Sequence, residues 1–123
     1  MISVDSYGWI ERFTNGPKAD LYNQVIEKAA PSEIVTSAIV LYEVYRKVKQ
    51  TVNEQNALEA VAAISQTLIS PLDQSISLEA ADYSLMLGLH MADAIVYATA
   101  RHHDAELYTS DENLKGQKGV SYL

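Results

Sequence analysis

Apolar residues in the first third of the chain alternate between strand-like and helix-like spacing. Residues 1–5 predict a short strand, and Trp9 and Phe13 fall on one face of a helix that follows it. The segment 15–17, Asn-Gly-Pro, ends that helix, and because proline is tolerated in the first turn of a helix, a second helix is predicted over 17–30.

The middle third predicts a strand, two helices and a weak strand. β-Branched residues favour a strand over 33–37, and the apolar spacing after it predicts a helix over 38–50. A further helix is predicted over 53–68, and Pro71 confines a weak strand over 69–72 to a sheet edge or a strand end. The positions assigned to the buried sides of these two helices are Leu41, Val44, Tyr45 and Val48, and then Leu58, Val61, Ala62, Ser65 and Leu68.

The last third predicts a pair of helices followed by two strands. Ser77 is the candidate N-cap of the first helix, and Gly88 lies just past its end. The second helix, over 91–103, is apolar on most of its sides, which predicts that it is buried. The last two strands are predicted over 106–109 and 120–123.

Short strands that alternate with helices indicate one α/β domain over residues 1–123. The expected architecture is a short, mostly parallel central sheet of about 4–5 strands flanked by helices. In sheets of this kind, ligands bind beyond the carboxyl ends of the strands, near the point where strand order reverses. Residues that directly follow the strands are therefore the first candidates for chemistry.

Composition and charge narrow the classes of function. The 123 residues are 48% hydrophobic, contain no cysteine and carry a formal charge of -7. The absence of cysteine excludes disulfides, thiol nucleophiles and thiolate metal sites. The acidic balance argues against broad attraction to nucleic acid, unless several acids gather in one pocket that binds metal ions. No secretory signal or membrane-spanning run is visible, so we expect a cytoplasmic protein with no membrane contact.

Four acidic residues fall at the starts or ends of predicted elements. Asp5 and Asp111 follow strands, Glu43 lies on the third predicted helix, and Asp93 lies near the start of the last one. Clusters of carboxylate oxygens suit Mg²⁺ or Mn²⁺, which are hard cations that bind through a few carboxylates, waters and substrate phosphate.

Each of these acids also has a purely structural explanation. Asp93 lies where a first-turn acid stabilises a helix N-terminus. Glu43 lies opposite the apolar stripe and shares its face with Arg46 and Lys47, as expected of a solvated helix face. Asp5 is flanked by apolar residues, so a buried position would require a partner or a cation. Spacing alone leaves both interpretations open.

Four segments of the chain carry a family resemblance. They read VDSYGWIE at 4–11, LYEV at 41–44, GLHMADAIVYATA at 88–100 and LYTSD at 107–111. In this order they resemble the PIN domain family, and especially the VapC toxin ribonucleases of toxin–antitoxin pairs. The resemblance extends over the whole chain, its third segment is the most specific, and it implies a three-layer PIN-like fold.

The resemblance implies a site made of acids and small hydroxyl side chains. The positions that match the family's catalytic, metal-binding quartet are Asp5, Glu43, Asp93 and Asp111. Ser6 and Thr109 match the hydroxyl positions that support it. Family members often carry a further acid two residues after the last of the quartet, where this chain has Asn113 beside Glu112. The implied cofactor is Mg²⁺ or Mn²⁺.

The implied function is that of a metal-dependent endoribonuclease, the toxin of a type II toxin–antitoxin pair, in which metal-activated water hydrolyses RNA. A cognate antitoxin protein is the implied inhibitor, and transfer RNA and ribosomal RNA are candidate substrates. A homodimer is the implied assembly, with the helices over 17–30 and 38–50 as candidate surfaces. A catalytically weak PIN-like module that binds RNA or protein is the alternative.

An RNA substrate requires positive charge outside the acidic pocket. Arg46, Lys47 and Lys49 follow Glu43 closely and are candidates for this role. Arg101 and Lys115 are candidates for a second basic rim. Each of these side chains is also explained as an ordinary solvated charge.

Two other classes of site fit less well. A receiver-like phosphoacceptor domain needs paired acids near the first strand and a lysine after the last one, and the chain supplies neither. Zinc ligation by His102 and His103 is disfavoured, because adjacent helical residues point about 100° apart and no cysteine completes a tetrahedral set.

Overall fold

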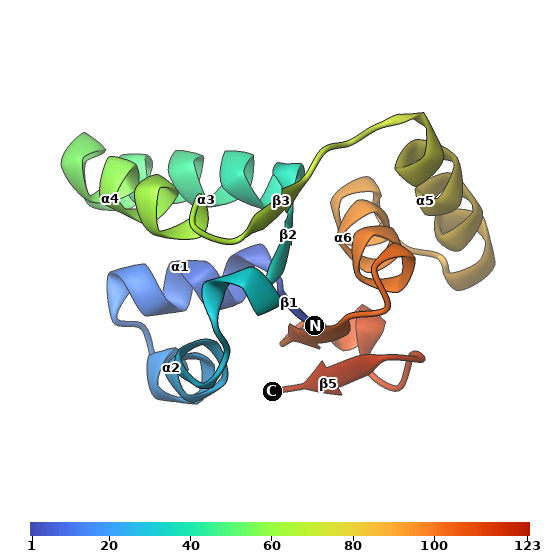
Figure 1. The fold of residues 1–123 in the computed structure, drawn as a ribbon, viewed down its shortest axis with the longest axis horizontal. Coiled ribbons are helices and arrows are strands. Elements are labelled where there is room, and N and C mark those ends of the chain that lie inside the picture. The colour runs from blue at the N-terminus through green and yellow to red at the C-terminus, as the bar shows by residue number, and fades with distance from the viewer.

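The computed structural model describes residues 1–123, which form six α-helices and five strands (Figure 1). In the first half of the chain these are β1 (Ile2–Val4), α1 (Ser6–Thr14), α2 (Ala19–Lys28), β2 (Val35–Ser37), α3 (Ala38–Thr51) and α4 (Glu54–Ile64). In the second half they are β3 (Leu68–Ser70), α5 (Gln74–Leu87), α6 (Met91–His102), β4 (Glu106–Thr109) and β5 (Val120–Tyr122). Two short 3₁₀ helices, η1 (Pro31–Glu33) and η2 (Glu112–Leu114), precede β2 and β5.

All strand pairs are parallel, and the strands lie in the order β3-β2-β1-β4-β5. β4 pairs with both β1 and β5, and β2 pairs with β3. A single bridge between Ile2 and Ile34 joins these two ladders. The chain first adds strands on one side of β1 and then crosses over to place β4 on its other side. Strand order therefore reverses at β1, and the carboxyl ends of β1 and β4 are where a ligand site is expected.

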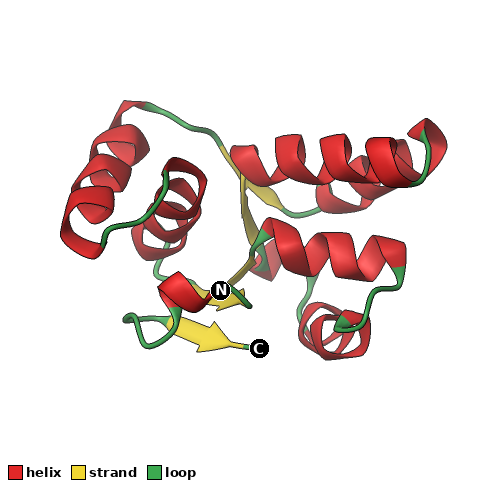
Figure 2. Cartoon of the chain, turned by 180° about the vertical axis from the view of Figure 1, so that it is seen from behind, coloured by secondary structure: helices red, strands yellow, loops and turns green.

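Helices cover the strands on both sides, as the three-layer α/β prediction requires. In Figure 1, α1–α4 lie on one side of the strands and α5 and α6 on the other, and Figure 2 shows the same division from behind. Trp9 of α1, Val44 of α3 and Leu107 of β4 are buried in the core. Residues 94–100 of α6 are all buried, which confirms the prediction for this helix. No helix of the protein combines the length and apolar character needed to cross a membrane.

Local sequence signals explain several element boundaries. α1 ends at Asn15 and α5 ends at Gly88, and both residues have left-handed backbone, with φ of 52° and 68°. Pro71 directly follows β3, as expected of a residue that cannot donate a hydrogen bond to a neighbouring strand. These element boundaries were predictable from the sequence, because each depends on the backbone conformation or hydrogen-bonding capacity of a single residue.

The buried sides of α3 and α4 differ from the prediction. The fully buried side chains on these helices are Val40, Val44 and Val48, and then Ala57, Ala60 and Ile64. Leu41 and Tyr45 are only half-buried, and Leu58 is 53% exposed. The small alanines allow α4 to approach α3 closely, and the chain leaves the helix after residue 64 because Leu68 pairs with Val35 in the sheet. The predicted helix end at residue 68 is therefore wrong.

The N-cap of α5 also differs from the prediction. Asp73 caps this helix, and its carboxylate accepts a hydrogen bond from the backbone N–H of Ile76 at 2.9 Å. Ser77 lies inside the first turns, where its hydroxyl donates to the carbonyl of Asp73 at 2.7 Å. The predicted cap at Ser77 is wrong because Asp73 supplies a carboxylate acceptor one turn earlier.

Candidate functional site

The carboxyl ends of β1 and β4 bring together acids from distant parts of the sequence. Asp5 follows β1, and Asp111 follows β4, which pairs with β1 in parallel. The first turn of α6 adds Asp93 at the same place. A cavity of about 300 Å³, here called the acidic cavity, opens between them. Its lining residues are Asp5, Ser6, Tyr7, Lys18, Asp93, Ser110 and Asp111.

Asp5 is held by two hydrogen bonds at the junction of β1 and α1. One carboxylate oxygen accepts from the backbone N–H of Gly8 at 3.0 Å, which makes Asp5 the N-cap of α1. The other oxygen accepts from the hydroxyl of Thr109. Burial raises the pKa of Asp5 to about 6, and the charges of Asp111 and Glu43 add to the rise, whereas the two hydrogen bonds oppose it.

Asp93 is strongly affected by the acids around it. Burial, together with its interaction with the Asp111 carboxyl and the charges of Asp111, Glu43 and Asp5, raises its pKa to about 7. A first-turn acid with no other role would be stabilised in its charged form by the helix dipole. The raised pKa therefore indicates that Asp93 belongs to a cluster of acids.

Glu43 does not lie on a fully solvated helix face. α3 packs against α1 as well as α4, so the side opposite its buried stripe is partly covered. Glu43 is half-buried, which raises its pKa, and a hydrogen bond with Ser6 opposes this rise. Its charge also raises the pKa values of Asp5 and Asp93. All four predicted acids are thus electrostatic neighbours.

The acidic cavity suits a hard divalent cation, because its aspartates, serines and tyrosine all offer oxygen atoms as ligands. No three acidic or histidine side chains are placed so that they would hold one ion between them. Mg²⁺ does not require such a cage, since it is usually held by one or two carboxylates, several waters and substrate phosphate. The arrangement therefore fits Mg²⁺ or Mn²⁺ bound in this open manner.

The predicted supporting residues fall into two groups. Ser6 lines the acidic cavity, and Thr109 is fully buried against Asp5. Glu112 and Asn113 are exposed in η2 and do not line the cavity. Asn113 contributes only its backbone N–H, which donates to the Asp111 carboxylate at 2.9 Å.

Three residues that line the acidic cavity, Tyr7, Lys18 and Ser110, were not identified from the sequence. Lys18 is the only cationic residue in the lining, and its Nζ donates to the backbone carbonyl of Leu123 at 2.8 Å. The Tyr7 hydroxyl donates to the buried carboxylate of Glu11 at 3.1 Å. No local motif marks these residues, because the packing of α1, α2 and the C-terminal strands brings them to the cavity.

The three predicted RNA-binding residues on α3 point to different surroundings. Arg46 and Lys47 line a second cavity, of about 610 Å³, between α1 and α3. Neither of them forms an ion pair within the chain. Lys49 lies outside this cavity and pairs with Glu54 at 3.5 Å.

The other two predicted RNA-binding residues do not line the acidic cavity. The Arg101 guanidinium donates to the carbonyl of Ala105 at 2.7 Å. Eight helical steps of about 1.5 Å place Arg101 about 12 Å along α6 from Asp93. Lys115 lies over the Tyr122 ring, with Nζ 4.8 Å from the ring centre. Both side chains are thus engaged within the fold.

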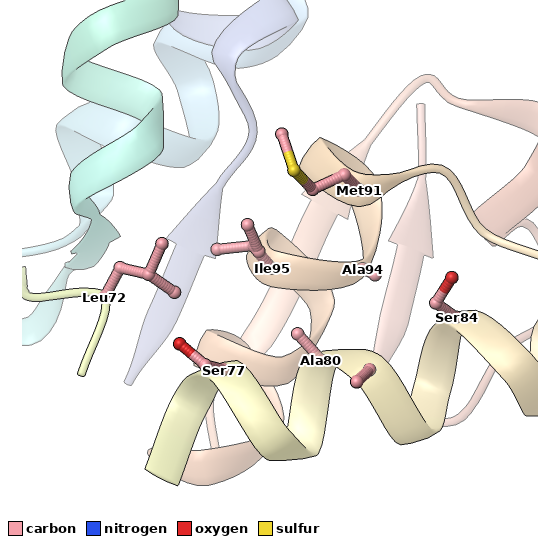
Figure 3. A pocket seen from close by; sticks show the side chains of 8 residues that line it. Leu72, Ser77, Ala80, Ser84, Met91, Ala94 and Ile95 are labelled. Carbon is pink, nitrogen blue, oxygen red and sulfur yellow. The ribbon is translucent and has the colours of Figure 1, made fainter. Parts of the chain in front are cut away.

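A separate cavity of about 340 Å³, here called the apolar cavity, lies between α5 and α6 (Figure 3). Figure 3 shows Met91, Ala94 and Ile95 on one wall, facing Ala80 and Ser77 of α5. Its full lining is Leu72, Ser77, Ala80, Ala81, Ser84, Met91, Ala94 and Ile95. No titratable side chain is among them, so this cavity offers no acid, base or metal ligand.

Comparison with known proteins identifies the family and the fold. The family model described as the PIN domain matches residues 2–119. A toxin–antitoxin complex from Klebsiella pneumoniae contains a chain that is 26% identical to this one, with a TM-score of 0.83. The match covers 98% of this chain and 96% of that chain.

Two further solved structures share the fold at lower identity. VapC20 of Mycobacterium tuberculosis, described as a sarcin-ricin loop cleaving toxin, is 17% identical over 86% of this chain and 85% of that chain, with a TM-score of 0.74. VapBC2 from Rickettsia felis, bound to a DNA fragment from its promoter, is 14% identical over 100% and 98%, also with a TM-score of 0.74. None of the curated proteins compared with the chain matches it in sequence.

Proposed function

Because the chain belongs to the PIN domain family, we propose that it is a VapC-type toxin, an endoribonuclease that hydrolyses RNA with Mg²⁺ or Mn²⁺. The observation that carries this proposal is the cluster of four acids where strand order reverses. Burial and neighbouring charge raise the pKa values of Asp5 and Asp93 in this cluster. A cation bound among ionised carboxylates would relieve that repulsion.

The residues of the acidic cavity have distinct roles in this proposal. Asp5 is oriented by Gly8 and Thr109, so its carboxylate is a fixed ligand. Asp93 and Asp111 line the same cavity and would act as further ligands in their ionised forms. A divalent cation held there supplies Lewis acidity, which lowers the pKa of the attacking water and neutralises phosphate charge.

Lys18 adds the one positive charge in the lining of the acidic cavity. Its Nζ is held by the carbonyl of Leu123 at 2.8 Å and lies 5.9 Å from the centre of the Tyr122 ring. A lysine held in this way is placed to pair with a phosphate oxygen that enters the cavity. We therefore assign Lys18 to substrate orientation.

We also propose that an antitoxin protein inhibits this chain, that it works in the cytoplasm, and that it forms a homodimer. The chain from the Klebsiella pneumoniae toxin–antitoxin complex supports the first point, since it matches nearly the whole length of this chain. Exposed large apolar side chains lie on the helices named from the sequence, at Leu21 and Tyr42, and also on α5 and at the start of α6. Those on α5 and α6 include Leu78, Leu85, Met86 and Met91.

The alternative is a PIN-like module that binds RNA or protein with little catalysis. The observation in its favour is that no three acids are arranged to hold one ion. The two proposals differ in whether purified protein cuts RNA when a divalent cation is supplied.

The deciding experiment measures cleavage of structured RNAs, including transfer RNA and ribosomal RNA fragments, with Mg²⁺, Mn²⁺ or EDTA. We expect cutting with either metal, none with EDTA, and none by Asp5→Asn, which keeps a cap residue at the start of α1. Circular dichroism would show that this variant is folded. Equal cutting by both proteins would indicate contamination and contradict the proposal.

The absence of cutting by folded wild-type protein, freed from any co-purified partner, would favour the binding module. Isothermal titration with Mn²⁺ provides a readout that does not depend on cleavage. Wild type is expected to bind Mn²⁺, and Asp5→Asn is expected to bind it more weakly. Light scattering on the same sample tests the homodimer.

A further inference from the structure

The cavity between α1 and α3, here called the α1–α3 groove, adjoins the acidic cavity. Ser6 and Tyr7 line both spaces, so the two lie side by side at the start of α1. On the opposite wall, α3 contributes Tyr42, with Arg46 and Lys47 about one helical turn further along the same side of the helix. The groove holds about 610 Å³, twice the volume of the acidic cavity.

Two tyrosines expose their rings at this groove. Tyr7 is 42% exposed and Tyr42 is 64% exposed. The Tyr7 ring is fixed in place, because its hydroxyl donates to Glu11 at 3.1 Å and its ring contacts Tyr22 edge-on at 6.2 Å. Exposed, oriented aromatic faces are the surfaces on which unpaired bases stack in proteins that bind single-stranded nucleic acid.

Arg46 and Lys47 supply the positive charge of this groove, whose lining also holds the acids Glu11 and Glu43. The Glu11 carboxylate is already engaged, because it accepts hydrogen bonds from the Tyr7 hydroxyl at 3.1 Å and from the backbone N–H of Lys18 at 2.8 Å. Arg46 and Lys47 form no ion pair, whereas Arg12 pairs with Glu27 at 3.2 Å and Lys49 pairs with Glu54 at 3.5 Å. Unpaired cations beside aromatic rings complement a ligand that carries both phosphates and bases.

We propose that the α1–α3 groove binds single-stranded nucleotides next to the phosphate that is cut, with Tyr7 and Tyr42 stacking on bases and Arg46 contacting the backbone. Lys47 adds a second phosphate contact. This inference rests on the proposed function, because it takes RNA as the substrate. From Ser6 to Thr14 the α1 wall is about 12 Å long, which is room for about three stacked nucleotides. Duplex RNA keeps its bases stacked inside the helix and offers none to the tyrosines.

The test measures binding of a fluorescently labelled single-stranded oligoribonucleotide by anisotropy, in EDTA, so that binding is read without cleavage. The same RNA annealed into a duplex serves as the comparison. We expect the single strand to bind more tightly, and Tyr42→Ala to weaken its binding about 5- to 150-fold, the range for loss of one stacked base. Tyr42→Phe keeps the ring and should bind like wild type.

Two variants that each remove one positive charge distinguish a contact in the groove from a general effect of net charge. Arg46→Gln should weaken binding and reduce the slope of log affinity against log salt by about 0.7, as expected for one lost contact to a single strand. Lys28→Gln removes the same charge from the exposed end of α2, outside the groove, and should leave binding unchanged. In the metal-supplemented cleavage assay, Tyr42→Ala should raise KM more than it lowers kcat.

Several outcomes would overturn the inference. One is that wild type does not bind the single strand or binds the duplex equally well. Another is that Tyr42→Ala and Arg46→Gln bind like wild type, which is the result expected if the groove accepts a protein segment instead. Failure of the proposed function looks different, because wild type and the groove variants would then all fail to cut RNA with metal, while the binding differences in EDTA remained.

Discussion

The first turn of α6 separates two cavities of similar size and opposite chemistry. Asp93 lines the acidic cavity of about 300 Å³, whereas Met91 and Ala94, its close neighbours in the chain, line the apolar cavity of about 340 Å³. Because successive helical residues point about 100° apart, one turn of helix serves both spaces. The two cavities therefore differ in their chemistry and not in their volume, since only the acidic cavity is lined by interacting carboxylates.

The two cavities also differ in what they contribute to stability. Side chains that border the apolar cavity, such as Ala94 and Ile95, are buried and add to the core. In the acidic cavity, the raised pKa values of Asp5 and Asp93 mean that folding disfavours their ionised forms. This is the pattern expected where function is maintained at a cost in stability.

The largest expected effect tests the comparison directly. Asp93→Asn should lower RNA cleavage at least about 100-fold, because it removes a charged ligand from the acidic cavity. Met91→Ala changes a residue two positions away that faces the apolar cavity, and it should leave the rate within about twofold of wild type. Initial rates at saturating Mg²⁺ measure both. A similar loss of cleavage in the two variants would show that catalysis depends on the whole first turn of α6 and not on the acidic cavity alone.

The next effect is the pH dependence of cleavage. The pKa values of Asp5 and Asp93, raised by burial to about 6 and about 7, mean that these ligands gain charge as pH rises through that range. Cleavage should therefore increase about tenfold per pH unit between about 6 and about 7, where one of the two groups titrates, and more steeply below about 6, where both must ionise. Because protons and metal compete for the carboxylates, the midpoint should move to lower pH as Mg²⁺ is increased. A midpoint that does not change with Mg²⁺ concentration would contradict competition between protons and metal.

A smaller effect is expected in thermal unfolding without metal. Burial and neighbouring acids raise the pKa of Asp93 from 3.8 to about 7, so folding loses stability as pH rises between these values. Asp93→Asn removes this loss and should raise Tm at pH 8 by a few degrees, about 1 kcal/mol after allowance for solvent screening of a half-exposed group. The gain should shrink as pH is lowered towards 4. A gain of the same size at all pH values would point to packing instead.

The smallest effect concerns the apolar cavity. Ala81→Leu adds apolar surface to its lining and should raise the free energy of unfolding by less than about 1 kcal/mol, with cleavage unchanged. Ala81→Gln adds a side chain of comparable length without the apolar contact and should give no such gain. Denaturant titration of the two variants measures the difference. A loss of cleavage in Ala81→Leu would show that the apolar cavity affects catalysis, which would contradict the separation of the two cavities.

The positions of strands and helices were predictable from the sequence, whereas the surroundings of some of their residues were not. The strand over 106–109 has the observed bounds of β4, and the burial of α6 follows from apolar residues on most of its sides. The buried side of α4 was not predictable, because apolar residues occur on more than one side of that helix. Its packing against α3 buries Ala57 and Ala60 and leaves Leu58 exposed. The environment of Glu43 was ambiguous for the same reason. Its helical position predicts exposure to solvent, but α1 packs against that side of α3.

The sequence by itself determined the order of strands and helices, the family resemblance, and the choice of four candidate acids. These features depend on residues within a few positions of one another, through backbone geometry and helical or strand spacing. Only the tertiary structure decided that Asp93 is half-buried beside other acids that raise its pKa, that Lys18 lines the acidic cavity, and that Arg46 is unpaired while Lys49 is not. Burial and charge interactions depend on residues that are distant in the chain, so they become defined only when the fold brings those residues together.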